Sequence, residues 1–180
     1  EASDWLDDNL ENEHVLVVPA ARFPRYLWGS PSDEITQPLL ESRWGVRSSI
    51  PLTPPATIRL LDSIDSVLSS GTGSAGLADV LARSGVRYLL LRSDLDYGRS
   101  GATPPMVARQ ALQRSPGLRR VTAFGPEIGG GRLPGVFADN GFDVPVQALE
   151  VWGVTPKAEA VAAYDAASLT TVIGGPESMM

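Results

Sequence analysis

The chain has 180 residues, of which 43% are hydrophobic and 20% are charged, so it can bury one substantial core but not two generous ones. Its 15 basic and 21 acidic residues give a net charge of −6, which argues against unspecific binding to nucleic acid or anionic lipid. The lack of Cys excludes disulfides and thiolate chemistry, and the single His14 excludes a His-based triad or a multi-His metal centre. We therefore expect one soluble domain over residues 1–180, with no nucleic-acid partner.

The N-terminal part of the sequence predicts a helix, a buried strand and a long loop. Residues 3–12 can form a short helix capped by Ser3. His14–Val18 is a β-branched run, typical of a strand that is buried on both faces. Residues 20–53 contain four Pro and several aromatic residues without a sustained period, so they predict a loop with one helical turn near residues 37–42.

The next segment predicts a helical crossover between two buried strands. A helix opens at Thr53-Pro-Pro, with Thr53 as its N-cap, and apolar residues recur at helical spacing as far as Leu68. A second short helix over residues 75–84 ends at Gly85, and Val86–Leu91 follows as a second buried strand. This order is that of a right-handed βαβ unit, so the two buried strands should be adjacent and parallel.

The C-terminal half predicts an antiparallel extension of the same sheet. A helix over residues 104–114 precedes strands over residues 118–124 and 146–154. Thr155-Pro156 predicts the start of a last helix that runs to about residue 167, and residues 169–173 predict a final short strand. The fold class is therefore α/β, with a mixed sheet that has a parallel βαβ core and an antiparallel extension, and with helices packed on the sheet.

Two acidic residues follow the second buried strand at the place where open α/β sheets bind ligands. The carboxylates of Asp94 and Asp96 are hard oxygen ligands for a divalent metal, as in the Asp-x-Asp of nucleotide-sugar glycosyltransferases. The other interpretation is that both residues cap the next turn and keep the strand end solvated. The pair therefore supports one hypothesis, a free-standing soluble α/β enzyme with an acidic metal site at Asp94 and Asp96.

One glycine-rich segment has the spacing of a dinucleotide-binding loop. Gly71, Gly73 and Gly76 match Gly-x-Gly-x-x-Gly, but they follow a helix, so the strand-to-helix turn that brings backbone amides to a pyrophosphate is missing. We therefore predict no bound cofactor.

The long loop gathers aromatic and Arg side chains that suit a polyhydroxylated ring. Aromatic faces stack on the C–H faces of sugars, and planar guanidinium groups donate paired hydrogen bonds. The residues predicted to contact glycan are Phe23, Arg25, Tyr26, Trp28, Arg43, Trp44 and Arg47. Two alternatives stay open: the loop could fold over the sheet with Trp side chains as hydrophobic anchors, or it could dock on a membrane domain.

Several short strings carry a resemblance to a known family. They include Val15-Leu-Val-Val-Pro19, Tyr26-Leu-Trp-Gly-Ser-Pro-Ser-Asp-Glu34, Trp44-Gly-Val-Arg47, Gly85-Val-Arg-Tyr-Leu-Leu-Leu-Arg92, Asp94-Leu-Asp96 and Gly174-Gly-Pro-Glu-Ser178. Across most of its length the sequence resembles the extracytoplasmic region of the mycobacterial α-(1→3)-arabinofuranosyltransferase D family. The resemblance lowers the weight of a metal at Asp94 and Asp96, because a lipid-linked donor needs no diphosphate-bound metal.

The resemblance implies a parent enzyme that is a large polytopic glycosyltransferase of the C type. Such an enzyme adds α-(1→3)-arabinofuranosyl branches to the arabinan of arabinogalactan and lipoarabinomannan, with decaprenyl-phosphoryl-arabinose as donor. Its catalytic carboxylate is expected near the first membrane helices, so no catalytic residue of the family is carried onto this sequence. The sequence does not begin with Met, and we expect it to be a piece of such a protein.

The resemblance also implies a place and a role for this piece. It would lie on the extracytoplasmic (periplasmic) face of the plasma membrane, with the membrane-embedded remainder of the same chain as its partner and the arabinan acceptor as a second candidate partner. We expect an accessory domain, structural or acceptor-guiding, that is not itself catalytic.

Overall fold

The structure is a computed structural model that describes residues 1–31, 33–48, 53–129, 144–155, 163 and 165–180. The strands are β1 (His14–Val18), β2 (Trp44–Val46), β3 (Val86–Arg92), β4 (Leu118–Ile128) and β5 (Val146–Val154). The helices are α1 (Ala2–Asn9), α2 (Thr36–Leu39), α3 (Pro55–Ser70), α4 (Leu77–Arg83), α5 (Tyr97–Ser100) and α6 (Pro105–Gln113), followed by the 3-10 turns η1 (Ala166–Ser168) and η2 (Pro176–Met179).

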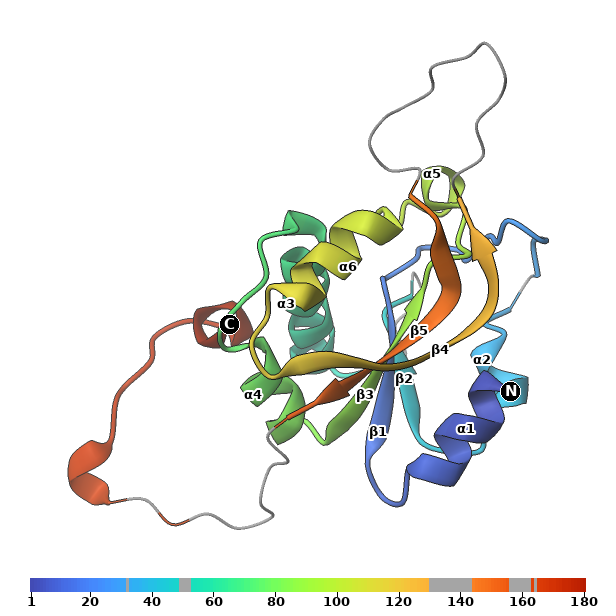
Figure 1. Ribbon diagram of the computed structural model, residues 1–180. Helices are drawn as coiled ribbons and strands as arrows, with labels where there is room; N and C mark the ends of the chain where they lie inside the picture. Colours follow the sequence, from blue (N-terminus) through green and yellow to red (C-terminus); the bar gives the residue numbers. More distant parts are fainter. Residues whose placement is uncertain (32, 49–52, 130–143, 156–162, 164) are drawn as a thin grey trace.

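The strands form one mixed sheet in the order β2-β1-β3-β5-β4 (Figure 1). The strand β1 pairs in parallel with β2 on one side and with β3 on the other, where Leu16 lies opposite Leu89. The strand β5 is antiparallel to both β3 and β4. The predicted α/β class is confirmed, as are the adjacent parallel pair and the antiparallel extension.

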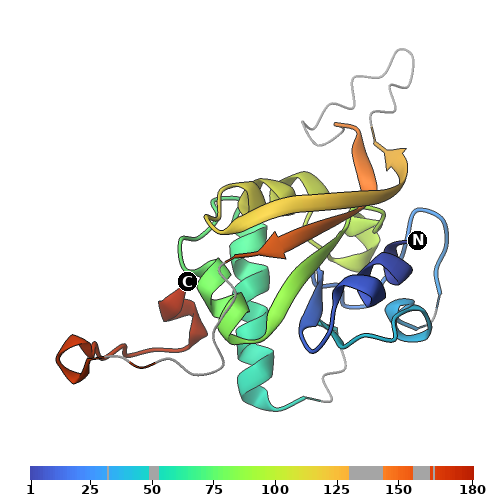
Figure 2. The ribbon, with the colours of Figure 1, turned by 60° about the horizontal axis from the view of Figure 1, so that its bottom comes forward.

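The helices cover the two faces of the sheet unequally. Figures 1 and 2 show α3, α4 and α6 on one face and α1 on the other. The larger core lies under the three helices, where Leu68 and Leu81 pack against Leu89. The smaller core lies on the other face, where Leu6 of α1 and Val151 of β5 are fully buried. Helices therefore pack on both faces of the sheet, and this packing fixes the positions of the strand ends.

One strand lies where the sequence predicted only loop. Residues 44–46 form β2, in which Trp44 pairs with Val15 of β1. The strand is short, half-buried and at the edge of the sheet, so it has neither a long β-branched run nor an alternating pattern. Parallel pairing with β1, and not local propensity, determines its conformation.

The helix starts and the C-terminal elements differ from the sequence predictions in detail. Neither Ser3 nor Thr53 caps a helix with its side chain, because α1 begins after Glu1 and α3 begins after Pro54. The predicted strand over residues 169–173 is wrong: these residues have no strand partner. The last predicted helix lies mostly outside the described residues, and its end forms the 3-10 turn η1.

The outer strand β4 is long but irregular. Its pairing with β5 shifts register between Arg120 and Thr122, and again between Phe124 and Glu127. Pro126, which has no backbone N–H, lies within the second irregularity. The edge of the sheet therefore bends and twists along its length.

Candidate functional site

The loop after β1 is folded tightly against the carboxyl end of β3. The backbone N–H of Leu27 donates to the carbonyl of Asp94 at 2.9 Å, and that of Asp96 donates to the carbonyl of Arg25 at 2.8 Å. The backbone N–H of Arg22 also donates to the carbonyl of Ser100, at 3.3 Å. These bonds align two segments that are far apart in the sequence, so the loop has a fixed position at the carboxyl edge of the parallel strands.

A buried arginine at the end of β3 holds this edge together. The side chain of Arg92 is 2% exposed, and its Nη1 donates to both carboxylate oxygens of Glu34, at 3.0 and 2.9 Å. The same nitrogen donates to the hydroxyl of Tyr26 at 3.1 Å, and Nη2 donates to the carbonyl of Pro19 at 3.2 Å. Thr36 adds a hydrogen bond from its hydroxyl to Glu34 at 2.9 Å. One guanidinium thus fixes three separate segments of the chain.

An exposed tryptophan is held in place by a buried carboxylate. The indole N–H of Trp28 donates to Oδ2 of Asp94 at 2.7 Å, and the ring stacks on Tyr26 with centroids 4.6 Å apart and an interplanar angle of 23°. Trp28 is nevertheless 60% exposed, whereas Asp94 is 7% exposed. Two contacts therefore set the orientation of a ring whose outer face stays open to solvent.

Burial changes the acidity of both residues that support the indole. Burial is the main cause that raises the pKa of Tyr26 to about 12, so its hydroxyl stays protonated at neutral pH. Burial also raises the pKa of Asp94, although the hydrogen bond from Trp28 opposes this effect. The second oxygen of Asp94, Oδ1, is buried without a hydrogen-bond partner among the described residues.

Further aromatic and apolar side chains project from the same two paired segments. Phe23 is 64% exposed and Tyr97, on α5, is 42% exposed. We call Phe23, Tyr26, Trp28 and Tyr97 the aromatic platform, in which Tyr26 is buried, at 4% exposed, and supports the ring of Trp28. Arg25 is exposed beside it. A stacked, fixed ring with one exposed guanidinium on the same loop is an arrangement that can bind the apolar face of a sugar.

Three of the seven predicted glycan residues lie outside the platform. Arg43 and Trp44 are at the amino end of β2, where Arg43 donates to the carbonyl of Asn12 and Trp44 packs against the smaller core. Arg47, after β2, pairs through Nε with Asp62 of α3 at 2.6 Å. Of the other four, Tyr26 and Trp28 stack on one another, and Phe23 and Arg25 are exposed on the same loop, so their contact with glycan stays a prediction.

The two aspartates of the metal hypothesis have separate tasks. Asp96 caps α5 by accepting a hydrogen bond from the backbone N–H of Arg99 at 3.1 Å, whereas Asp94 accepts one from Trp28. Among the residues that the structure describes, no three His, Cys, Asp or Glu side chains are placed to hold a metal ion. The hypothesis of an acidic metal site gains no support from this geometry.

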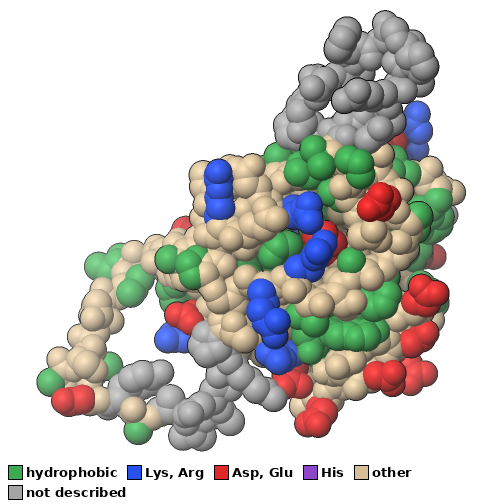
Figure 3. Space-filling model, in the orientation of Figure 1, with side chains coloured by type: hydrophobic (Ala, Val, Ile, Leu, Met, Phe, Trp, Pro, Cys, Tyr) green, Lys and Arg blue, Asp and Glu red, His purple; other side chains and the backbone are tan. Residues whose placement is uncertain are grey.

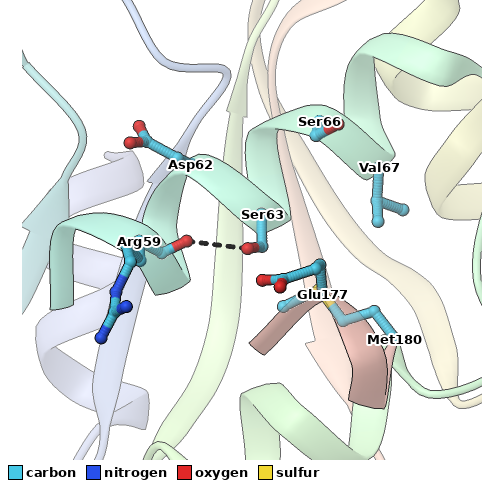
Figure 4. A pocket seen from close by; sticks show the side chains of 7 residues that line it. All are labelled: Arg59, Asp62, Ser63, Ser66, Val67, Glu177 and Met180. Atoms are coloured by element: carbon cyan, nitrogen blue, oxygen red, sulfur yellow. Dashed lines mark hydrogen bonds between the residues drawn. The ribbon is translucent and has the colours of Figure 1, made fainter. Parts of the chain in front are cut away.

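A cavity lies between α3 and η2, away from the aromatic platform (Figure 4). The cavity has a volume of about 490 Å³ and is lined by Arg59, Asp62, Ser63, Ser66, Val67, Glu177 and Met180. Hydrogen bonds from backbone N–H groups, including that of Gly175 at 2.8 Å, lower the pKa of Glu177. Met180 packs against the larger core. The packing of Met180 places the closing turn against the core under α3.

Comparison with known proteins identifies the family. The sequence profile described as alpha-(1->3)-arabinofuranosyltransferase, N-terminal GT-C domain (GT-C_AftD), matches residues 1–180. This chain belongs to that family. The family comprises membrane glycosyltransferases, which confirms the resemblance seen in the sequence. Among the described residues, no helix combines the length and the apolar character needed to cross a bilayer.

Two curated arabinofuranosyltransferases align with this chain over its whole length but over only a small part of their own. The alpha-(1->3)-arabinofuranosyltransferase of Mycolicibacterium smegmatis (strain ATCC 700084 / mc(2)155) is 41% identical over 191 residues, and that of Mycobacterium tuberculosis (strain ATCC 25618 / H37Rv) is 42% identical over 186 residues. Each alignment covers 100% of this chain but 13% of the relative.

The solved structures give the same picture of the fold. The cryo-EM structure of arabinofuranosyltransferase AftD from mycobacteria matches 98% of this chain with 39% identity and a TM-score of 0.86, over 14% of that chain. An arginine-to-serine mutant of the same enzyme matches 85% of this chain with 40% identity and a TM-score of 0.81, over 12% of its own length. The remainder of a much longer polypeptide is therefore the partner that these relatives support.

Sequence reasoning missed the residues that support the platform. Arg92 and Glu34 are 58 positions apart, and nothing in their local sequence indicates that they pair. Tyr97 directly follows Asp94-Leu-Asp96, which sequence reasoning considered only as a metal site or a turn cap, so its aromatic ring was not assigned to the glycan cluster. The one usable signal was Arg92 itself, a charged residue that continues an apolar strand and so must find a buried partner.

Proposed function

We propose that this chain is a non-catalytic accessory domain of a membrane arabinofuranosyltransferase, and that its aromatic platform guides the arabinan acceptor. The parent enzyme would add α-(1→3)-arabinofuranosyl branches to cell-wall arabinan from decaprenyl-phosphoryl-arabinose. The family assignment supports the enzyme class, and the names of the relatives supply the linkage and the sugar. The domain would lie on the extracytoplasmic face, where the cell-wall acceptor is found.

The observation that carries the acceptor role is the exposed, doubly supported ring of Trp28. A surface tryptophan that served only as a hydrophobic anchor would bury its ring, yet this one is 60% exposed. Its two supports, the Tyr26 ring and the Asp94 carboxylate, prevent it from collapsing onto the surface. A ring that is ordered before binding loses little conformational freedom when a sugar stacks on it.

Binding at such a platform is expected to be weak. A Kd of about 1 mM corresponds to only about 4 kcal/mol, and an arabinofuranose oligomer that contacts one indole face and one guanidinium belongs in this range. Attachment to a membrane enzyme raises the effective concentration of the acceptor near the platform. Weak contacts are therefore sufficient for guidance, because the acceptor must also move on after each transfer.

The test is an NMR titration of the chain with arabinofuranose oligomers. We expect shift changes at Trp28, Tyr26 and Tyr97, and we expect the Trp28→Ala variant to lose them. Arg43→Ala is the control variant. Arg43 is also exposed, but it directly precedes β2, at the amino edge of the parallel strands and away from the platform. Each variant is first checked by its amide spectrum for an intact fold.

Two results would reject the proposal. One is the absence of shifts at tens of millimolar oligomer, which would leave the platform a purely structural role. The other is a set of shifts that persists unchanged in Trp28→Ala, which would place the sugar elsewhere on the domain.

A further inference from the structure

Arginine side chains gather on one part of the surface, over β4 and β5. Figure 3 shows them as a column of Lys and Arg side chains on this face, with acidic side chains at the lower right, over α1. Contacts and register connect four arginines near this end of the two strands: Arg119 and Arg120 are consecutive on the outer strand β4, Arg109 shares Glu150 with Arg120, and Arg87 donates to the carbonyl of Val154, which lies opposite Leu118. We call these four residues the arginine stripe.

The net charge of the whole chain conceals this stripe. Residues 1–13 contain six acidic residues and no basic one, so they alone carry a charge of −6. Residues 83–120 contain eight Arg against Asp94 and Asp96, which gives +6 over this segment. The average of −6 therefore describes neither region, and the sequence argument against an anionic partner does not apply to the face over β4 and β5.

A buried glutamate holds two members of the stripe from below. Glu150 is 0% exposed, and its Oε1 accepts a hydrogen bond from Nη1 of Arg120 at 3.1 Å. Nε of Arg109 lies 3.3 Å from the same oxygen, and the indole N–H of Trp152 donates to Oε2 at 3.1 Å. The Arg120 side chain remains 47% exposed and that of Arg109 23% exposed. Their guanidinium groups are thus anchored on the inside and open on the outside.

The other two members extend the stripe across the sheet. Nη1 of Arg87 donates to the carbonyl of Val154 at 2.8 Å, and its guanidinium lies 5.3 Å from the centroid of the Tyr88 ring. Arg119 lies opposite Gly153, is exposed, and makes no ion pair with a described residue. Among the described residues, only Arg109 and Arg120 pair with a buried carboxylate, so the four guanidinium groups leave an excess of positive charge at the surface.

We propose that the arginine stripe docks this domain on the anionic phospholipid headgroups of the membrane. Guanidinium groups pair with phosphate oxygens through two parallel hydrogen bonds, and anchored guanidinium groups lose little freedom when they do so. Basic residues next to an anionic leaflet are attracted to it individually, and their contributions add along a stripe. A membrane surface lies close to this domain in the parent protein, because members of the family are membrane glycosyltransferases. This inference is independent of the aromatic platform and of sugar binding.

The test is flotation of the chain with lipid vesicles, in matched sets of phosphatidylcholine alone and phosphatidylcholine with phosphatidylglycerol. We expect binding only to the vesicles with phosphatidylglycerol, and loss of this binding at about 1 M salt, where the Debye length falls to about 3 Å. Arg119→Glu is the test variant because its side chain makes no ion pair with any residue in the described ranges. Its affinity should fall about tenfold or more, since two units of charge are lost from the stripe.

Arg43→Glu is the charge-matched control, because it changes the net charge equally on the far edge of the sheet. It should float like the native chain, and both variants should melt like it. Three results would overturn the proposal: no binding to phosphatidylglycerol vesicles at low salt, equal binding to both kinds of vesicle, or equal losses in Arg119→Glu and Arg43→Glu. The last result would mean that total charge, and not the stripe, controls binding.

Discussion

The carboxyl edge of the parallel strands and the β4–β5 half of the sheet each contain a buried ion pair, but the more deeply buried partner has the opposite sign in the two regions. At the carboxyl edge the buried residue is Arg92, and its partner Glu34 is 14% exposed. In the β4–β5 half the buried residue is Glu150, and its partner Arg120 is 47% exposed. The less buried partner lies nearer the solvent, and it is the carboxylate of Glu34 in the first region and the guanidinium of Arg120 in the second.

Removing Glu150 should have the largest effect on stability. Glu150→Ala leaves the guanidinium groups of Arg109 and Arg120 without their shared anion and leaves the indole N–H of Trp152 unpaired inside the core. Breaking a buried charge network in this way costs about 3–5 kcal/mol in the free energy of unfolding. Urea denaturation measures the loss, and a loss below about 1 kcal/mol would show that the network rearranges without its centre.

Removing Arg92 should lower the free energy of unfolding by less than removing Glu150 does, because the partner of Arg92 lies nearer the surface. Arg92→Met keeps most of the buried volume, and the abandoned Glu34 is close enough to the surface to recover water. The carbonyl of Pro19 and the hydroxyl of Tyr26 lose a donor, so we expect a loss of about 2–3 kcal/mol in the same urea experiment. A loss as large as that of Glu150→Ala would contradict the view that the rim partner can be rehydrated.

A smaller effect is expected from Asp94, and it should depend on pH. Burial raises the pKa of Asp94 above its ordinary value of 3.8, so the folded chain binds this proton at a higher pH than the unfolded chain. The resulting stability is complete below the unfolded pKa and is lost as the pH rises through the folded pKa. Asp94→Asn cannot ionise and keeps an oxygen acceptor for Trp28, so it should avoid this loss.

The measurement is the difference between two pH profiles of unfolding free energy, native and Asp94→Asn, from about pH 3 to pH 7. The variant should gain a few tenths to about 1 kcal/mol relative to the native chain over this range. Parallel profiles would show that Asp94 titrates alike in the folded and unfolded chains. Subtracting the profiles removes the contribution of Asp65, whose pKa is also raised by burial.

The smallest effect is expected at Arg43, which belongs to neither network. The side chain donates a long, exposed hydrogen bond to the carbonyl of Asn12, at 3.4 Å. Arg43→Ala should therefore change the free energy of unfolding by about 0.5 kcal/mol or less. A larger change in thermal melting would disqualify Arg43 as the control residue for both binding experiments.

Sequence reasoning succeeded where burial on both faces of a strand left a continuous apolar run. The bounds of β5 were predicted as observed, and β1 and β3 were predicted as adjacent parallel strands. It failed at β2, where three half-buried residues follow a Pro-rich stretch and depend on β1 for their conformation. It also failed at residues 169–173, whose β-branched side chains favour a strand but have no partner strand to pair with.

The site could be predicted in part, because composition indicates chemistry but not pairing. The cluster of aromatic and Arg residues indicated the platform, yet its assignment to Trp44 overlooked a strand that buries one side of that ring. The burial of Glu150 could have been predicted, because strict alternation along β5 places its side chain on the same face as Trp152 and Val154. Its arginine partners lie 30 and 41 positions away, and only the folded sheet brings them together.

The irregular course of β4 also bears on how this domain behaves at high concentration. A regular outer strand of 11 residues would offer a second molecule an unpaired row of backbone groups, which is the usual start of ribbon-like aggregation. Two register shifts and Pro126 interrupt that row, and positive charge at Arg119 and Arg120 repels an identical edge. The same strand that displays cations thus protects the sheet from growing by self-association.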